Sequence, residues 1–292
     1  MGRPDRLSNT TRLLTLLSGL TFLLLGTVLF TTPSWSAERF AWKVSPFVAM
    51  TIGAWCLGTA AMAWIAYRDL RWSSVHPVLL YLWSFAVLEL GVLVWFRDSL
   101  RLDLPISWPY VGTLVLGLVA AGSGITDLIR HRPALPKEAP VPVWVRVLWL
   151  LFIPFVTFLV VQAVLKAKGA PGRGVFPEPL SAFTVRAFGA FYLSLVISGI
   201  PLFWARSTRA VTAIFWGGLA LSLLILTATL VFFDRFDFGA HPLQLLYLGA
   251  YVGATAISLV VVLRSGARSE RSISWAPQAR TDHEGKIRLD TN

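Results

Sequence analysis

The stretch SPFVAMTIGAWCL at 45–57 has a counterpart, SAFTVRAFGAFYL, at 181–193. Ser, Phe, Gly, Ala and Leu fall in register when Ser45 is aligned with Ser181. Further along, RLDL at 101–104 aligns with RFDF at 235–238, and YVG at 110–112 aligns with YLG at 247–249. The three alignments need small changes of spacing between apolar segments and none within them. This pattern predicts a chain made from two copies of one helical unit.

Hydrophobic residues make up 55% of the chain and charged residues only 14%, whereas a soluble domain carries about 25% charged residues. A membrane core about 30 Å thick needs roughly 20 apolar residues per helix, and backbone polar groups in hydrocarbon must be satisfied within the helix. The sequence thus predicts an all-α polytopic membrane protein with eight transmembrane helices in a 4+4 parallel internal repeat. The expected helices are 13–31, 46–66, 76–96, 109–129, 143–165, 182–204, 210–233 and 242–263.

The first apolar segment has two interpretations. Basic residues precede it and Ser36-Ala37 follow it, as in a cleaved signal peptide. Against this, Trp35 lies where a small residue is needed, and the apolar run exceeds the usual 7–15 residues. We expect the segment to be retained as a membrane helix.

The distribution of basic residues predicts the orientation. Of the 26 Lys and Arg residues, 17 lie in the two termini and in the connections on the same side as the termini. Because cytoplasmic loops carry an excess of Lys and Arg, we expect both termini in the cytoplasm. Four helices per copy would give both copies the same orientation, related by a pseudo-twofold axis along the membrane normal.

The expected domain organisation follows from these segments. A proline-rich linker with four prolines suits a stiff, solvated connection between the copies, and a polar tail without apolar periodicity suits disorder. In chain order we expect a cytoplasmic N-terminus (1–12), a first four-helix repeat (13–130), a cytoplasmic linker (131–142), a second four-helix repeat (143–264) and a disordered cytoplasmic tail (265–292).

Glu89 and Arg186 form the first candidate site, an intramembrane polar site. Glu89 is the acid deepest inside an expected helix, about 10 Å from its external end, and Arg186 lies about 6 Å deep in the sixth helix. Ionisable groups in a membrane are costly and usually paired, and they often mark a pathway. The sequence leaves open a substrate or proton site, a structural ion pair, and an arginine that reaches the interface beside a protonated glutamate.

Two clusters of charged residues form the second candidate site, at the external ends of the hairpins. They could form the mouth of a pathway or a shallow polar site. Alternatively, each cluster is a local salt bridge that closes its hairpin, and such a bridge is worth little when exposed. The clusters are Asp98, Arg101 and Asp103 in the first repeat, and Asp234, Arg235 and Asp237 in the second.

No cofactor is expected. No two of the four histidines share a helix face at ligand spacing, which disfavours zinc or haem within the bundle. The single cysteine, Cys56, excludes an internal disulfide. The segment Gly117–Gly124 is helical and apolar, so it does not form a phosphate-binding loop. We therefore predict neither metal ligands nor catalytic residues.

The start of the second copy, FPEPLSAFTVRAFGA at 176–190, resembles a stretch in uncharacterised multi-pass integral membrane proteins of actinobacteria and related bacteria. In those proteins a Pro-Leu-Thr segment precedes a Gly-Ala-aromatic segment. The resemblance implies a bacterial inner (cytoplasmic) membrane. No activity is assigned to those proteins, so no functional residue is carried over.

Three classes of function stay open from the sequence. The first is a small-solute or ion transporter with a pathway between the two repeats. The second is a non-catalytic accessory or scaffold subunit of a membrane complex, and the third is a membrane-embedded enzyme acting on lipid or isoprenoid substrates. The residues favour a non-enzyme. The expected partners are the lipid bilayer and either a second copy of the chain or a membrane-complex subunit, with no nucleic acid.

Overall fold

The computed structural model describes residues 5–69, 71–133, 141–165, 175–203, 207–274, 280–281 and 287–288. The α-helices in this part are α1 (Asn9–Thr31), α2 (Pro33–Glu38), α3 (Pro46–Arg68), α4 (Trp72–Trp95), α5 (Ser107–His131), α6 (Val143–Leu165), α7 (Ala182–Gly199), α8 (Thr208–Val231) and α9 (Gln244–Ser274). Three short 3₁₀ helices are η1 (Arg97–Ser99), η2 (Ile200–Phe203) and η3 (Phe233–Arg235), and the short strands β1 (Arg280–Thr281) and β2 (Ile287–Arg288) pair antiparallel. All the α-helices except α2 are long and apolar enough to cross a membrane, which confirms the predicted all-α fold with eight membrane helices.

The two aligned stretches begin their helices in the same way. The Ser45 hydroxyl accepts a hydrogen bond from the backbone N–H of Val48, and the Ser181 hydroxyl accepts one from the backbone N–H of Thr184, each at 3.1 Å. Both serines are N-caps, which satisfy a backbone donor that the first helical turn leaves free. The aligned serines therefore mark the starts of α3 and α7.

Several boundaries differ from the predicted ones. Helix α4 begins at Trp72, so Pro77 lies inside the helix and not at its start. Helix α7 ends at Gly199 and tightens into η2 around Pro201, which has no backbone N–H to continue the α-helix. The short helix α2 was not expected. It begins at Pro33, and proline is favoured at the first helical position because its φ angle is already helical.

The C-terminal helix is longer than the expected domain boundary implies. Helix α9 continues to Ser274, past the predicted start of the tail at residue 265. Residues 134–140 of the linker and residues 1–4 lie outside the described part of the chain. The domain boundaries and the disorder of the remaining tail stay predictions.

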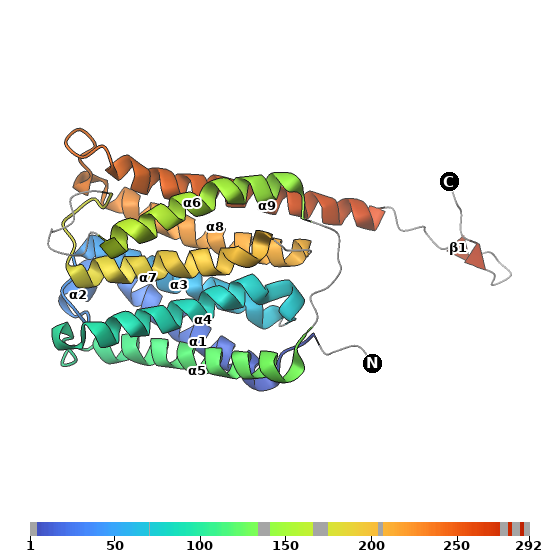
Figure 1. Cartoon of the computed structure of the whole chain (residues 1–292), viewed down its shortest axis with the longest axis horizontal. Helices are drawn as coiled ribbons and strands as arrows, with labels where there is room; N and C mark the ends of the chain where they lie inside the picture. The colour runs from blue at the N-terminus through green and yellow to red at the C-terminus, as the bar shows by residue number, and fades with distance from the viewer. Residues whose placement is uncertain are drawn as a thin grey trace.

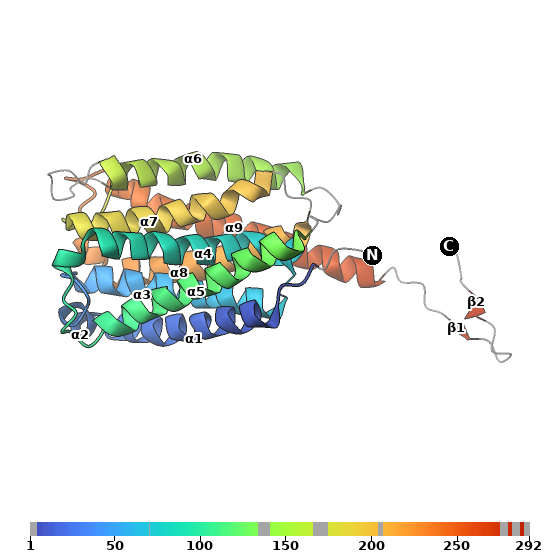
Figure 2. The same cartoon turned by 60° about the horizontal axis from the view of Figure 1, so that its bottom comes forward.

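The helices form a bundle along one common direction (Figures 1 and 2). Helix α1 begins and α9 ends at the same end of this bundle, which we call the terminal face. The opposite end, where α3, α5, α7 and α9 begin, is called the loop face. If the chain has the orientation expected from its basic residues, the terminal face is cytoplasmic.

Helices α3, α4, α7 and α8 lie at the centre. Helix α3 packs against α1 and α8, while α7 packs against α6 and α4, and α4 also contacts α8. Helix α3 has 78% of its most apolar window buried, whereas α6 has 17% and lies at the periphery (Figure 2). The central helices therefore form the core, and α1, α5, α6 and α9 surround it.

Close helix contacts depend on small and aromatic residues. The rings of Trp55 on α3 and Phe191 on α7 stack at 4.5 Å between centroids, with an angle of 6° between planes. A Cβ atom at Gly58 would lie 2.5 Å from Leu221 Cδ1, so α3 approaches α8 only because residue 58 has no side chain.

Candidate functional site

Glu89 lies on α4 with its side chain fully buried. The Tyr110 hydroxyl of α5 donates a long hydrogen bond of 3.5 Å to Glu89 Oε2. Glu89 Oε1 has no hydrogen-bond partner among the described residues. A buried polar atom without a partner costs about 1–3 kcal/mol. Glu89 is thus incompletely satisfied where it lies.

Arg186 does not make the direct contact with Glu89 that the sequence suggested. Its guanidinium donates to the backbone carbonyl of Val164 on α6, and no ion pair within the described part of the chain joins it to Glu89. Helix α7 packs against both α4 and α6, and Arg186 contacts the α6 side. The estimated depth of a residue in the bundle does not determine which way its helix is rotated.

The first external cluster is dispersed on the loop face. Asp98 lies 3.8 Å from Arg97 in η1, with both side chains largely exposed. The Arg101 guanidinium instead donates to the Glu38 carbonyl of α2 at 2.8 Å. Asp103 is exposed. Arg101 thus joins the α4–α5 hairpin to α2, and the two aspartates of this cluster are exposed at the surface.

The second external cluster has different contacts. Arg235 lies 3.8 Å from Asp234, again largely exposed. Asp237 accepts a hydrogen bond from the backbone N–H of Ala240, and its own backbone N–H donates to Gln244. The clusters therefore do not share one geometry, and exposed ion pairs of this kind contribute roughly 0–1 kcal/mol.

A contact on the loop face that the sequence reading missed joins the starts of the two aligned helices. The Ser45 hydroxyl at the start of α3 donates to Glu178, which precedes α7. Conversely, Trp42, which precedes α3, donates from its indole N–H to the Thr184 hydroxyl of α7 at 3.0 Å. Burial raises the pKa of Glu178 above its usual value, although the Ser45 hydrogen bond acts in the opposite direction.

At the terminal face, a cavity of about 700 Å³ lies between α3, α4, α6, α8 and α9. We call it the interfacial cavity. Its volume falls within the range of about 300–1,000 Å³ that is usual for ligand pockets. Two arginines, Arg209 and Arg264, line it together with Asp69 and two tryptophans, Trp144 and Trp216. The cavity therefore combines charge with apolar surface, as does the membrane–water interface itself.

The charges in the interfacial cavity are unbalanced. Arg71 holds Asp69 through two hydrogen bonds, of 2.7 and 3.2 Å, which lower the pKa of Asp69 below its usual value. The guanidinium of Arg264 lies 4.8 Å above the Trp144 ring, a cation–π contact. Arg209 and Arg264 make no ion pair within the described part of the chain. Among the described residues that line the cavity, positive charge is therefore in excess.

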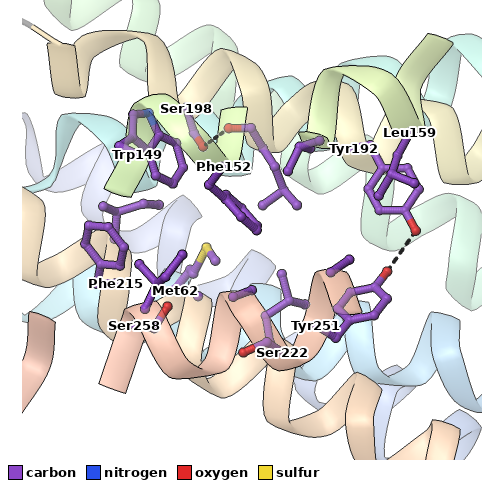
Figure 3. Close-up of a pocket in the computed structure, with 18 residues that line it drawn as sticks. Met62, Trp149, Phe152, Leu159, Tyr192, Ser198, Phe215, Ser222, Tyr251 and Ser258 are labelled. Carbon is purple, nitrogen blue, oxygen red and sulfur yellow. Dashed lines mark hydrogen bonds between the residues drawn. The ribbon is translucent and has the colours of Figure 1, made fainter. Parts of the chain in front are cut away.

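A second cavity, here called the apolar cavity, lies deeper between α6, α7, α8 and α9 (Figure 3). Its volume is about 70 Å³ and its lining is almost wholly apolar. The Tyr192 and Tyr251 hydroxyls face each other at 2.9 Å on one side, and Trp149 and Phe215 lie at the other end (Figure 3). The cavity is too small for a whole lipid chain, but it is partly open between the helices.

The two cavities follow one another along the same three helices. On α6, Trp144 lines the interfacial cavity and Trp149 the apolar one; on α9, Arg264 lines the first and Ser258 the second. Six residues of helical rise separate Arg264 from Ser258, which is about 9 Å. A polar, positively charged site at the membrane surface therefore leads to an apolar site in the hydrocarbon.

Sequence reasoning missed this arrangement. Arg209 and Arg264 entered only the count of basic residues that predicts the orientation. The available signal was that Trp144, Arg209 and Arg264 lie at the terminal-face ends of the membrane spans of α6, α8 and α9, with Trp216 two turns into α8. The sequence does not show which of these helices meet. Among the described residues, no group of three His, Cys, Asp or Glu side chains could hold a metal ion.

Comparison with known proteins finds no match to the chain among protein-family models, curated proteins or solved structures. Its class therefore follows from the fold alone. Eight long apolar helices are those of an integral membrane protein in a lipid bilayer.

Proposed function

We propose that the chain is a lipid-binding integral membrane protein, made of two equivalent four-helix halves, and that its second half takes up one amphiphilic lipid along α6, α8 and α9. The observation that carries this proposal is the succession of a large interfacial cavity and an apolar cavity along the same helices. A lipid has the same succession of a polar head and an apolar chain. Because the apolar cavity is small, the chain would lie along the opening between α6 and α9.

Helix boundaries support the two equivalent halves. Helices α3 and α7 start at positions 46 and 182, and the same spacing separates both ends of α4 from those of α8 and both ends of η1 from those of η3. Helices α1 and α6 start at positions 9 and 143, and α5 and α9 start at 107 and 244. The spacing thus changes only slightly from one helix pair to the next. Because the spacing between α4 and α8 is the same as that between η1 and η3, Asp98 is the counterpart of Asp234 in this alignment.

Contacts between the halves are reciprocal, which also supports their equivalence. Helix α3 packs against α8, while its counterpart α7 packs against α4. Phe47 contacts Phe232, and their counterparts Phe183 and Phe96 contact each other. Trp55 and Phe191 are counterparts that stack on one another, as expected of residues near a twofold axis.

The halves differ at the apolar cavity. A cavity at the equivalent place in the first half measures only about 10 Å³. There Leu82 and Trp83 fill the space, whereas Gly218 takes the place of Leu82 in the second half. The counterparts lining the two cavities are Thr15 and Trp149, Ser18 and Phe152, Phe22 and Val156, Leu82 and Gly218, Gly117 and Ala254, and Ala120 and Ile257. A site open in one half only is a reason to place the function in that half.

The other classes have less support. Glu89 lines neither the interfacial cavity nor the apolar cavity, so neither of them supports a transport pathway through it. The apolar cavity holds tyrosine, tryptophan and serine side chains but no carboxylate, histidine or cysteine that could serve as a catalytic base or nucleophile. Lipid binding without a chemical step therefore fits best.

The test compares the wild type with a variant in which a larger side chain fills the apolar cavity. Phosphatidylcholine with a photoreactive diazirine on its acyl chain would be incorporated with the protein into nanodiscs, and labelled peptides mapped after irradiation. We expect labelling to concentrate on α6 and α9 and to fall at least fivefold in Gly218→Leu, which copies the filled first half. Gly122→Leu on α5 is the matched control, because a Cβ there meets nothing within 4 Å.

Two results would contradict the proposal. One is labelling spread evenly over all membrane helices. The other is unchanged labelling in Gly218→Leu, provided that the variant elutes as a folded species. If Gly218→Leu does not fold, Ala254→Leu fills the same cavity from α9 and serves in its place.

A further inference from the structure

We propose that Arg209 and Arg264 bind the phosphate group of an anionic phospholipid in the interfacial cavity. This inference rests on the proposed function and specifies its ligand: a phosphodiester lipid with net negative charge, drawn from the leaflet at the terminal face. Three independent observations support it, from charge, from the first half of the chain and from position.

The first observation is a pair of guanidinium groups that no described carboxylate binds through a hydrogen bond or ion pair. Arg209 and Arg264 both border the cavity. The nearby carboxylate of Asp69 is bound by Arg71 at 2.7 Å and interacts with Arg209 only through its charge, while Arg264 lies over the Trp144 ring. Neither Arg209 nor Arg264 has a hydrogen bond or ion pair to the described residues. Arginine binds phosphate well because its planar guanidinium donates two parallel hydrogen bonds. An anion between α8 and α9 would find two such groups.

The second observation comes from the equivalent place in the first half. The alignment of α4 with α8 makes Ser73 the counterpart of Arg209, and that of α5 with α9 makes Asp127 the counterpart of Arg264. In the first half, the Asp5 carboxylate accepts a hydrogen bond from the Ser73 backbone N–H at 3.0 Å. The Ser8 backbone N–H donates to Asp127 at 2.8 Å. The N-terminal segment thus occupies this place and supplies an anion to the start of α4.

In the second half nothing within the described residues replaces that anion. The alignment of α1 with α6 makes Ala139 the counterpart of Asp5 in sequence, and Ala139 and the neighbouring Glu138 both lie outside the described part of the chain. The side chains that met Asp5 and Ser8 in the first half are replaced by arginines at 209 and 264. The first half binds a carboxylate of its own chain. The second half has guanidinium groups at these two places, and among its described residues no carboxylate takes the place of Asp5.

The third observation is position. Trp144, the second residue of α6, lines the same cavity, and tryptophan is enriched where headgroups meet hydrocarbon. Val261 and Val262 continue the apolar wall toward the apolar cavity. Basic pockets between membrane helices on the cytoplasmic side are suited to anionic headgroups. A soluble phosphate would gain nothing from this apolar wall, whereas a phospholipid would.

The experiment compares two lipids with identical chains. Phosphatidylglycerol is anionic and phosphatidylcholine is zwitterionic, and native mass spectrometry counts each lipid retained on the detergent-solubilised full chain. We expect tighter binding of phosphatidylglycerol. Since a basic residue near an anionic lipid is worth about 1 kcal/mol, Arg209→Gln and Arg264→Gln should each weaken phosphatidylglycerol binding about fivefold and the pair about 25-fold. Phosphatidylcholine binding should change less than twofold.

The control is Arg130→Gln. Arg130 lies in the last turn of α5, also at the terminal face but in the first half, and is exposed. The Arg130→Gln variant removes the same unit of charge and should leave the preference for phosphatidylglycerol over phosphatidylcholine unchanged. The proposal is overturned if Arg130→Gln weakens phosphatidylglycerol binding as much as Arg209→Gln, or if inorganic phosphate at equal concentration displaces the lipid.

Failure of this inference and failure of the proposed function give different results. If the wild type binds phosphatidylglycerol and phosphatidylcholine equally while Gly218→Leu still blocks acyl-chain labelling, the lipid site stands and its anion selectivity is refuted. If labelling is indifferent to Gly218→Leu, the lipid site itself fails. If an arginine variant does not fold, raising the salt from 0.1 to 0.5 M in the wild type provides the test, because screening should reduce the preference for phosphatidylglycerol.

Discussion

Gly124→Ala should destabilise the protein, whereas Gly122→Ala on the same helix should not. A Cβ at Gly124 would lie 2.0 Å from Cζ2 of Trp83, far inside contact distance. Trp83 is a rigid, buried ring that helps to fill the first half, so it cannot yield as a flexible side chain would. A Cβ at Gly122 would meet nothing within 4 Å.

The magnitude follows from the difference between the two variants. Overpacking a tight core typically costs about 1–3 kcal/mol. Replacing glycine by alanine in a helix contributes up to about 1 kcal/mol in the opposite direction. That gain is common to both variants, so it cancels when they are compared. We expect Gly124→Ala to be less stable than Gly122→Ala by about 1–3 kcal/mol.

The assay is reversible unfolding in mixed micelles with increasing SDS, followed by tryptophan fluorescence and far-UV circular dichroism. Trp83→Phe in the Gly124→Ala background should recover part of the loss, because the smaller ring withdraws from the new methyl group. Equal stability of Gly124→Ala and Gly122→Ala would refute the contact between α4 and α5 on which this reasoning depends.

Three further outcomes are expected. Glu89→Gln and Arg186→Met should have additive effects on unfolding free energy within about 0.5 kcal/mol, because the two side chains share no contact; coupling larger than this would restore the pair. Burial raises the pKa of Glu178, so the folded state binds its proton more readily than the unfolded state. The stabilisation is then present at low pH and lost as pH rises through the folded-state pKa. Thermal stability should therefore fall over that range in the wild type but not in Glu178→Gln, and equal pH profiles would contradict this. A cytoplasm-active reporter should function after Asn292 and fail when inserted near Gly172; activity at both positions would exclude the eight-helix topology.

The external charged clusters show that a short charged motif does not predict the contacts of its side chains. The sequence aligned Arg101 with Arg235 because both begin an RxDx pattern. In the proposed alignment of the two halves, η1 aligns with η3 instead, so that Asp98 would correspond to Asp234. The Arg101 side chain extends to α2, which has no predicted counterpart. Short charged motifs in connections are weak guides, because a small change in loop length moves every side chain.

The candidate intramembrane site shows a second limit. Sequence spacing gave the depths of Glu89 and Arg186, because rise per residue is fixed in a helix. It did not give the direction in which each side chain points relative to the neighbouring helices. Glu89 is directed toward Tyr110 of α5, and Arg186 toward Val164 of α6. The predicted pairing of Glu89 with Arg186 therefore depended on the rotation of each helix about its axis, which sequence spacing does not determine.

Hydropathy alone determined the eight membrane helices and their approximate ends, because in hydrocarbon each helix satisfies its own backbone hydrogen bonds and needs no partner to do so. The repeated SPF and SAF stretches also located the capped starts of α3 and α7. Only the tertiary structure decided that α3 packs on α8 and α7 on α4, and that Arg209 and Arg264 share a cavity. Those facts depend on contacts between residues far apart in the chain, where close packing of side chains, and not local propensity, sets which faces meet.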